Sequence, residues 1–465
     1  MRICGERLLK KRIFGKRVFD IKILSKRALN KIIPKYAGCY LSALFLVFSL
    51  FFCSCSTSLD TEPAIVTVSA TESPVPAETP HPSPTPSPTP SPTPEPTEEP
   101  FEEYDITLMA VGDNLMHMGI VRTGKQDDGS YDYSFLFENI LEFLEQADIK
   151  VINQETIFGG NELGFSGYPY FNSPTQVGDA IAEAGFNVVL HASNHAADQK
   201  ISGLKNCVNF WKQYPEVLML GITGDDPTEE IPLLKVNDIT FAVLNYTYGP
   251  NMATLPSSLM GHLNMLCDYN QKTGAIDFTT INPQVLKDIE DAKKVADIVI
   301  VCPHWGTEYR TTPSNYQKKF AGQMSEAGAD LILGTHPHVP QPVEWIAAEN
   351  GHETLCYYSL GNYVSTQRHA ICMLEEMALV TFHVTEEGVS IEHESSGVLP
   401  LVCHYKYGPL RLVGVYPLEE YTEEQASVHG IRSYGGVALH LKDLEESSQN
   451  IFGDMILTKS DILSR

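Results

Sequence analysis

Positive charge is scarce over most of this chain. Of its 33 Lys and Arg residues, 12 lie in residues 1–35, beside only two acidic residues. The rest of the chain therefore carries 21 basic and 56 acidic residues, a formal charge of -35. So acidic a body would repel a phosphate backbone, which argues against nucleic acid as a partner. It suits a domain that stays soluble outside the cell, or one that binds cations.

Cysteine pairs of the C-x-x-C type and internal repeats are also missing. None of the ten cysteines forms a C-x-x-C pair, so the sequence does not indicate a zinc knuckle. Six cysteines lie beyond residue 55, several of them in apolar runs typical of strands, and we expect these to be buried free thiols. An exported chain could also form a disulfide among them. The six are Cys207, Cys267, Cys302, Cys356, Cys372 and Cys403.

An uncharged stretch, residues 36–59, follows the basic residues 1–35. It is long enough to span a bilayer, and the basic residues before it predict an N-terminus that stays in the cytoplasm. We therefore expect a membrane-anchored protein whose later domain lies outside the cell. A cleaved signal peptide and a lipid attached to Cys55 are alternatives, and both also place the body of the chain outside the cytoplasm.

Residues 60–103 have the composition of a linker. The stretch "HPSPTPSPTPSPTPEPTEEP" has proline at nearly every second position, which favours extended polyproline II and cannot form a core. Such a segment serves as a spacer through a cell wall or as a disordered tether. We expect the folded domain at residues 104–402. Residues 403–465 carry weaker signals, those of a strand pair and a helix or tail, and are interpreted as a C-terminal extension.

Within the folded domain, apolar runs typical of strands alternate with segments of helical spacing. Strands are predicted in "DITLMAVGD", "IKVINQE", "NVVLHASNH", "IVIVCPHWG" and "LILGTHPH". Helices are predicted in "FLFENILEFLEQAD", "TQVGDAIAEAGF", "PQVLKDIEDAKKVAD" and "NYQKKFAGQMSEAGAD". This alternation predicts an α/β fold. The late segments "TLCYYSLGNYV", "MALVTFHV" and "GVSIEHE" have no long helix between them, which indicates antiparallel strands at one side of the sheet system.

Polar side chains collect where the predicted strands end. In open α/β sheets, ligands gather beyond the carboxyl ends of the strands. Carboxylate and amide oxygens suit hard divalent cations, and imidazole suits Zn, Mn or Fe. A carboxylate that bridges two cations about 3.5–4 Å apart would create a site for phosphate and water, while a free imidazole could protonate a leaving oxygen. The residues are Asp113, Glu155, Asn194, His195, His304, His336 and His338.

The stretches "VGDNLMH", "NQET", "SNHAADQ", "HWGTEY", "GADLILGTHPHVPQPVE" and "YSLGNYV" together resemble the bacterial capsule-synthesis protein family, of the CapA or poly-γ-glutamate-synthesis type. The resemblance runs from about Ile106 to Leu401 and is most specific from His304 to Asn362. That family resembles the calcineurin-like metallophosphatases, so the resemblance implies a four-layer αββα sandwich with mixed sheets and two divalent metal ions on loops that follow strands.

The resemblance also implies roles for individual residues. At the first metal, Asp113 and His338 would be ligands, and at the second, Asn194, His304 and His336, with Glu155 bridging the two. His195 would contact phosphate or act as an acid, so that His195 and Asp113 are the predicted catalytic residues. Glu308 and Asn362 would complete the substrate side of the site, Glu308 from its rim and Asn362 in support from a late strand.

The sequence departs from the metallophosphatase pattern at two places. Leu115 stands where those enzymes commonly have a histidine, and Glu155 replaces the usual aspartate. His117, two residues beyond Leu115, is either a displaced ligand or an ordinary loop histidine. His191 lies within a predicted strand and is expected to be structural.

Two functions compete at this stage. The first is a surface-anchored, metal-dependent phosphoesterase-like hydrolase in capsule or poly-γ-glutamate metabolism, acting on a phosphoester or an anionic polymer. The second is a non-catalytic scaffold or export subunit of a polymer-synthesis complex, with a structural metal site. A module that only binds anionic polymer is a third interpretation, which the acidic body disfavours, although salt screens long-range repulsion.

Overall fold

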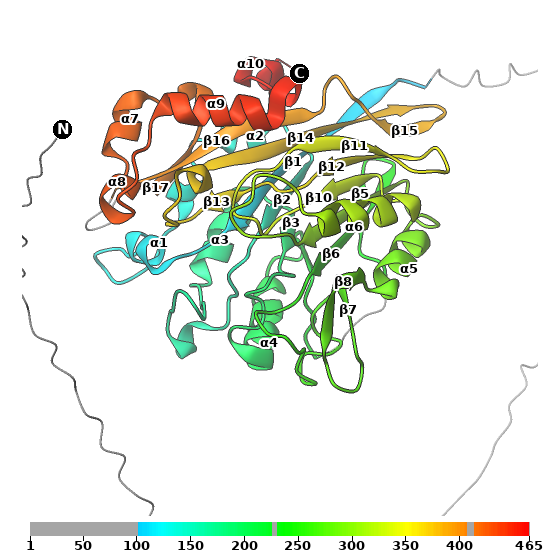
Figure 1. Ribbon diagram of the computed structural model, residues 1–465, viewed down its shortest axis with the longest axis horizontal. Coiled ribbons are helices and arrows are strands. Elements are labelled where there is room, and N and C mark those ends of the chain that lie inside the picture. Colours follow the sequence, from blue (N-terminus) through cyan, green and yellow to red (C-terminus); the bar gives the residue numbers. More distant parts are fainter. Residues whose placement is uncertain (1–100, 226–229, 407–412, 465) are drawn as a thin grey trace, which may run out of the picture. The chain divides into compact units, whose positions relative to one another are not determined.

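The computed structural model describes residues 101–225, 230–406 and 413–464 (Figure 1). The predictions for residues 1–35, for the apolar stretch 36–59 with Cys55, and for nearly all of the linker fall outside these residues. Within them, no helix is both long and apolar enough to cross a bilayer. The first strand begins at Tyr104, next to the predicted start of the folded domain.

The first of two large sheets is mixed. Its strand order is β17-β16-β14-β1-β2-β3-β4, with β13 pairing to β1 and β15 to β14. The strands β1 to β4 and β13 run parallel, whereas β14 to β17 pair antiparallel. The antiparallel prediction is confirmed for "MALVTFHV" and "GVSIEHE", but is wrong for the end of "TLCYYSLGNYV", which forms β13 and pairs parallel with β1. The bounds are β1 Tyr104–Asn114, β2 Ile149–Asn153, β3 Val188–Leu190, β4 Leu218–Leu220, β13 Asn362–Val364, β14 Leu374–Thr385, β15 Gly388–Ile391, β16 Gly397–Tyr405 and β17 Val413–Pro417.

The second sheet has the order β11-β12-β10-β9-β6-β5. Its inner strands β12, β10, β9 and β6 are parallel, and β11 and β5 pair antiparallel at the two edges. A separate two-stranded hairpin, β7 with β8, precedes α5. The bounds are β5 Leu233–Val236, β6 Ile239–Thr247, β7 Cys267–Tyr269, β8 Ile276–Ile281, β9 Ile298–His304, β10 Leu331–Leu333, β11 Val343–Ala347 and β12 Glu353–Tyr357.

Three apolar layers hold the sheets and helices together. The middle layer joins the sheets face to face, with Ile106 and Val380 of the first sheet in one cluster with Val243 and Ile300 of the second. A second cluster covers the outer face of the first sheet under helices that include α3, α4 and α9. The third covers the outer face of the second sheet under α5 and α6 (Figure 1). The predicted α/β class with mixed sheets is confirmed, and the layer order is helix, sheet, sheet, helix.

The helices are short. Their α-helical bounds are α1 Met118–Thr123, α2 Leu141–Leu144, α3 Gln176–Glu183, α4 Lys200–Trp211, α5 Pro283–Ala292, α6 Asn315–Glu326, α7 Glu423–Val428, α8 Ile431–Tyr434, α9 Leu441–Phe452 and α10 Lys459–Leu463. The 3-10 turns are η1 Ser134–Leu136, η2 Asn161–Leu163, η3 Ala370–Met373, η4 Leu418–Glu420 and η5 Gly453–Met455. Local sequence explains where the two helices on the second sheet begin. Ser314 and Gln317 form a capping box at the start of α6, and Asn282 caps α5 ahead of a proline.

Three predicted boundaries differ from the structure. The helix predicted over residues 135–148 is reduced to η1 and α2. The chain turns between these two elements at Phe137, whose ring packs on Tyr363 and Phe186. The strand predicted in "TLCYYSLGNYV" divides into β12 and β13, which belong to different sheets. The boundary predicted between residues 402 and 403 falls inside β16, and the residues described beyond it continue the first sheet and its outer helices.

Strand β14 carries two adjacent acidic residues into the interior. The side-chain oxygens of Glu375 and Glu376 are buried and have no hydrogen-bond partner in the described structure. Their neighbours in sequence place them on opposite faces of the strand, Glu375 with the outer cluster and Glu376 with the layer between the sheets. Burial raises the pKa of both carboxyl groups well above the usual value.

We expect Glu376→Met to be more stable than the native protein at neutral pH, by about 1–4 kcal/mol. The folded-state pKa of Glu376 is raised, so this carboxyl group lowers stability progressively as pH rises from the unfolded-state pKa toward the folded one. The gain should therefore be small near pH 4 and larger near pH 8, measured by urea denaturation. Glu387→Met, at an exposed turn, is the control. A gain that does not change with pH would contradict the prediction.

Candidate metal centre

The predicted site residues meet at one rim, where the parallel strands of both sheets end. From the first sheet, Asp113 lies at the end of β1, Glu155 two residues beyond β2, and Asn194 with His195 in the loop after β3. From the second sheet, His304 is the last residue of β9, and the two remaining histidines follow β10. All seven side chains are buried, with Asp113, Glu155, Asn194, His195, His304, His336 and His338 each at most 5% exposed.

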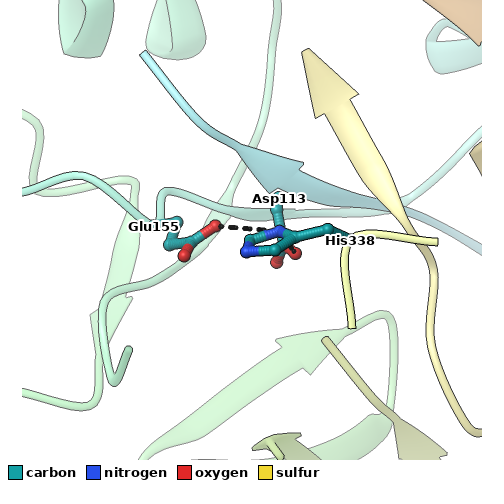
Figure 2. Close-up of side chains that lie close together, drawn as sticks. All are labelled: Asp113, Glu155 and His338. Carbon is teal, nitrogen blue, oxygen red and sulfur yellow. Dashed lines mark ion pairs between the residues drawn. The ribbon is translucent and has the colours of Figure 1, made fainter. Parts of the chain in front are cut away.

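One half of the site consists of Asp113, Glu155 and His338 (Figure 2). The Nδ1 atom of His338 lies 3.0 Å from Asp113 Oδ2 and 3.7 Å from Glu155 Oε2. One ligand atom from each of the three residues lies within 4.8 Å of the others. Two carboxylates and an imidazole converging in a buried space are a donor set that a divalent cation could accept.

The other half consists of Asn194, His304 and His336. His304 Nε2 is 4.0 Å from Glu155 Oε1 and 3.0 Å from Asn194 Oδ1. The His336 ring centroid lies 4.8 Å from that of His304. His304 Nδ1 is 2.9 Å from the hydroxyl of Thr335, which orients the ring with Nε2 toward Asn194. Glu155 therefore presents one oxygen to each half of the site.

Several donor atoms in this centre lack partners. Both carboxyl oxygens of Glu155 and the Nδ1 atom of His336 are buried without a hydrogen bond to any part of the chain that the structure describes. Buried polar atoms are rarely left unpaired in proteins, and an unrecorded ion is one ordinary explanation. The chemistry of the donors and these orphaned atoms both fit divalent cations.

The surroundings of the centre shift the pKa values of its histidines in opposite directions. Burial lowers the pKa of His304 and of His336 well below the usual value, so both rings are neutral and can offer a lone pair. Burial alone would do the same to His338, but the carboxylates of Glu155 and Asp113 raise its pKa to about 9. Burial raises the pKa of Glu155 well above the usual value. A cation would have to displace the proton of His338, so its affinity should rise with pH.

The loop between β10 and β11 holds its two histidines in an unusual backbone conformation. His336 has φ 99° and His338 has φ 60°, on either side of Pro337. These values lie where residues other than glycine are uncommon, and such strain is concentrated at functional sites. The backbone N–H of His336 points at the Asp113 carboxylate, 3.2 Å from Oδ2.

Asn362 and Glu308 were predicted to face substrate, and the structure places them differently from each other. Asn362 is fully buried, with Oδ1 3.1 Å from His338 Nδ1 and its amide donating to the His338 carbonyl, so it positions that histidine and does not face solvent. Its place follows from the strand pairing, in which it lies opposite Asp113. Glu308 is exposed in the loop after β9, which agrees with a position at the rim.

A scan of protein families matches residues 107–367 to the family described as bacterial capsule synthesis protein PGA_cap. The chain belongs to this family. The match covers most of the folded domain, from β1 to just beyond β13, and contains every residue of the candidate centre.

Two curated proteins of capsule synthesis are similar to this PGA_cap chain. The "PGA biosynthesis protein CapA" of Bacillus subtilis (strain 168) is 34% identical over 212 residues, which cover 45% of this chain and 50% of that protein. The "Capsule biosynthesis protein CapA" of Bacillus anthracis is 26% identical over 295 residues, 62% of this chain and 66% of that protein. The chain thus spans about half the length of the first relative and just under two thirds of the second.

Two solved structures show a distant likeness to this PGA_cap chain. A hypothetical protein from Thermus thermophilus aligns over 62% of this chain and 98% of its own, with 15% identity and a TM-score of 0.33. A 5'-nucleotidase from Candida albicans aligns over 61% of this chain and 48% of its own, with 10% identity and a TM-score of 0.31. At these scores neither likeness carries an argument about the site.

Sequence reasoning overlooked two residues that support the PGA_cap centre. Asn153 donates to Asp113 Oδ1 at 2.7 Å, and Asp198 Oδ2 lies 2.8 Å from His195 Nδ1. Both lie in stretches noted for other residues, "NQET" and "SNHAADQ". The spacing of Asp198 three residues after His195 was the available signal. His191 accepts a hydrogen bond from the Trp211 indole at 2.8 Å, which agrees with its predicted structural role.

Proposed function

We propose that this capsule-synthesis family member is a metal-dependent, phosphoesterase-like hydrolase of the metallophosphatase type. One observation carries the proposal. The buried carboxylate of Glu155 stands between two groups of ligands, with one oxygen toward each and neither oxygen hydrogen-bonded. A carboxylate that bridges two cations needs one free oxygen toward each group of ligands. The carboxylates of Glu375 and Glu376 are also buried and unpaired, but among the described residues neither belongs to a group of possible metal ligands, as Glu155 does.

The proposed ligands divide between two cations. Asp113, Glu155 and His338 would hold the first, and Glu155 with Asn194, His304 and His336 would hold the second. The imidazole and carboxylate mixture suits Mn, Zn or Fe. Such a pair, when bound, neutralises charge on a phosphoester and lowers the pKa of a bound water.

His195 has the setting of an acid–base residue. Its Nδ1 lies 2.8 Å from Asp198 Oδ2, and the same oxygen accepts the backbone N–H of Phe171 at 2.7 Å. This pairing assigns the proton on Nδ1 to the bond with Asp198 and leaves Nε2 to give or take a proton at a leaving oxygen.

The proposed setting is the outer side of the cell membrane, in capsule or poly-γ-glutamate metabolism. The names of the two Bacillus relatives support the process. The uncharged residues 36–59 after a basic leader support the anchoring. An anionic polymer or a phosphoester would be the substrate, and subunits of a polymer-synthesis complex would be partners.

The proposal is tested by metal content and hydrolysis together. Purified protein loaded with Mn, Zn or Fe should retain about two ions by mass spectrometry, the number its two ligand groups imply. It should also cleave a generic phosphodiester or phosphomonoester. The double variant His336→Ala with His338→Ala should lose most of the metal and the activity. His383→Ala, an imidazole bonded to Asp105 at the other end of β1, is the control.

Two outcomes would count against the proposal. Native protein that binds no divalent metal under several loading conditions would show that the metal-centre interpretation is wrong. Native protein that binds metal but cleaves neither a broad phosphoester panel nor poly-γ-glutamate would favour the non-catalytic scaffold.

A further inference from the structure

Tyr309 is a large aromatic residue that stays exposed beside the metal centre. It lies in the loop between β9 and α6 and is 41% exposed. Its ring centroid nevertheless lies 6.1 Å from that of the buried His338. Tyrosines with a structural role are different, because Tyr357 and Tyr363 are fully buried and their hydroxyl groups donate to backbone carbonyls. Tyr309 therefore stands where the centre meets solvent.

The backbone of Tyr309 is held in an unfavourable conformation. Its φ is 63°, in the left-handed region that bulky residues rarely adopt. Its N–H donates at 2.8 Å to the carbonyl of Pro337, the residue between two histidines of the centre. The carbonyl of the next residue, Arg310, accepts a hydrogen bond from Gln341 Nε2 at 2.7 Å. Strain of this kind persists only where the surrounding structure fixes it, and it is concentrated at functional sites.

The hydroxyl group of Tyr309 already has partners. Gln367 Nε2 donates to it at 3.4 Å, and the side chain of Glu308 is a second hydrogen-bond partner. The ring also packs beside that of the exposed His369, with the two centroids 4.9 Å apart. The part of Tyr309 that remains for a ligand is the exposed aromatic surface of its ring, next to His338.

We propose that Tyr309 is a specificity-determining residue, whose ring contacts a cyclic organic group attached to the phosphoryl group at the metal centre. This inference rests on the proposed function and deepens it, because it names the class of substrate. Ligand sites commonly combine aromatic side chains with a few polar groups, and a ring packed on tyrosine gains from apolar burial and from the ring contact itself. Poly-γ-glutamate contains no ring, so Tyr309 favours a ring-bearing phosphoester over that polymer as the substrate.

Two probes that cannot be hydrolysed isolate the contact with the ring. Phenylphosphonate and methylphosphonate present the same charged group to the metals, but only the first carries a ring. In calorimetry with the metal-loaded full chain, native protein should bind phenylphosphonate more tightly by about two- to tenfold, the range expected for an aromatic contact. Tyr309→Ala should lose this preference and keep its affinity for methylphosphonate. Tyr309→Phe retains the ring and should retain the preference.

Tyr316→Ala is the matched control. Tyr316 is also an exposed tyrosine, at 49%, but it lies in α6 on the outer face of the second sheet. Its replacement should leave both affinities unchanged. Metal content, measured on the same samples, should be equal in native protein and in all of these variants.

Several results would overturn the inference. Native protein with equal affinity for the two probes, or with affinity for neither, would do so, as would a Tyr309→Ala variant that keeps the preference. Equal weakening of both probes in Tyr309→Ala, or loss of its metal, would show that Tyr309 only supports the metal ligands. Loss of the preference in Tyr309→Phe would assign the contact to the hydroxyl group instead. The hydrolase proposal fails separately, because a native protein that prefers phenylphosphonate but cleaves no ester would refute hydrolysis and leave the Tyr309 contact in place.

Discussion

Replacing Glu155 with glutamine should abolish tight metal binding and make the metal-free protein more stable. The carboxylate presents one oxygen to each half of the centre. Mutating a residue that only supports a metal ligand weakens metal affinity by up to about 100-fold, so loss of a direct ligand should weaken it by at least that much. The same carboxylate is buried and unpaired without metal, and burial raises its pKa. Asp113, 3.0 Å from His338, remains to balance the charge of that imidazole when Glu155 is replaced. Removing the second buried charge should therefore stabilise the metal-free protein by about 1–3 kcal/mol.

Both effects can be measured on one set of samples. Titration with Mn or Zn gives the affinity, and thermal unfolding with and without chelator gives the stability. Glu308→Gln changes an exposed carboxylate near the same rim and should alter neither quantity by much. If Glu155→Gln bound metal as tightly as native protein, Glu155 would not be a bridging ligand.

Gly112→Ala should cost the protein about 3 kcal/mol of stability, the upper end of the usual overpacking cost, and disrupt the centre with it. A Cβ atom at residue 112 would lie 2.1 Å from the carbonyl oxygen of Gly361, which belongs to backbone and cannot move aside alone. That oxygen accepts the N–H of Asp113 at 2.9 Å. The clash would therefore separate β1 from the segment before β13 and displace Asp113 from Asn362.

Urea denaturation and metal titration of Gly112→Ala would measure the two consequences. Gly322 offers a matched control, because it lies inside α6 and a Cβ there would meet nothing within 4 Å. Gly322→Ala should stabilise the protein by about 1 kcal/mol through helix propensity. A Gly112→Ala variant as stable as native protein would show that the close approach of the two strands is not required.

The location of the site could be predicted from the sequence because it depends on local signals. Each of Asp113, Glu155 and His304 ends or closely follows an apolar run that forms a strand, and parallel strands bring their carboxyl ends to one edge. The capping residues of α5 and α6 are equally local. The predicted membrane anchor and linker remain predictions, because they lie outside the described residues.

What could not be predicted depends on pairing between distant segments. Asn153 reaches Asp113 only because β2 lies beside β1 in one particular register. The run "TLCYYSLGNYV" contains a turn signal in Ser359, Gly361 and Asn362, but nothing local indicates that the strands on either side of it join different sheets. Gly361, at φ 74°, turns the chain between them. Asn362 was expected near substrate, but its partner is His338, 24 residues away.

The division of ligands between the two sheets bears on how the protein matures. Asp113 and His336 are 223 positions apart, and one comes from each sheet. A chain that leaves a ribosome or an export channel N-terminus first has only part of its metal ligands in place until β10 joins the second sheet. Tight cation binding would then be a late step of folding. The protein would take up its metal in the compartment where folding is completed.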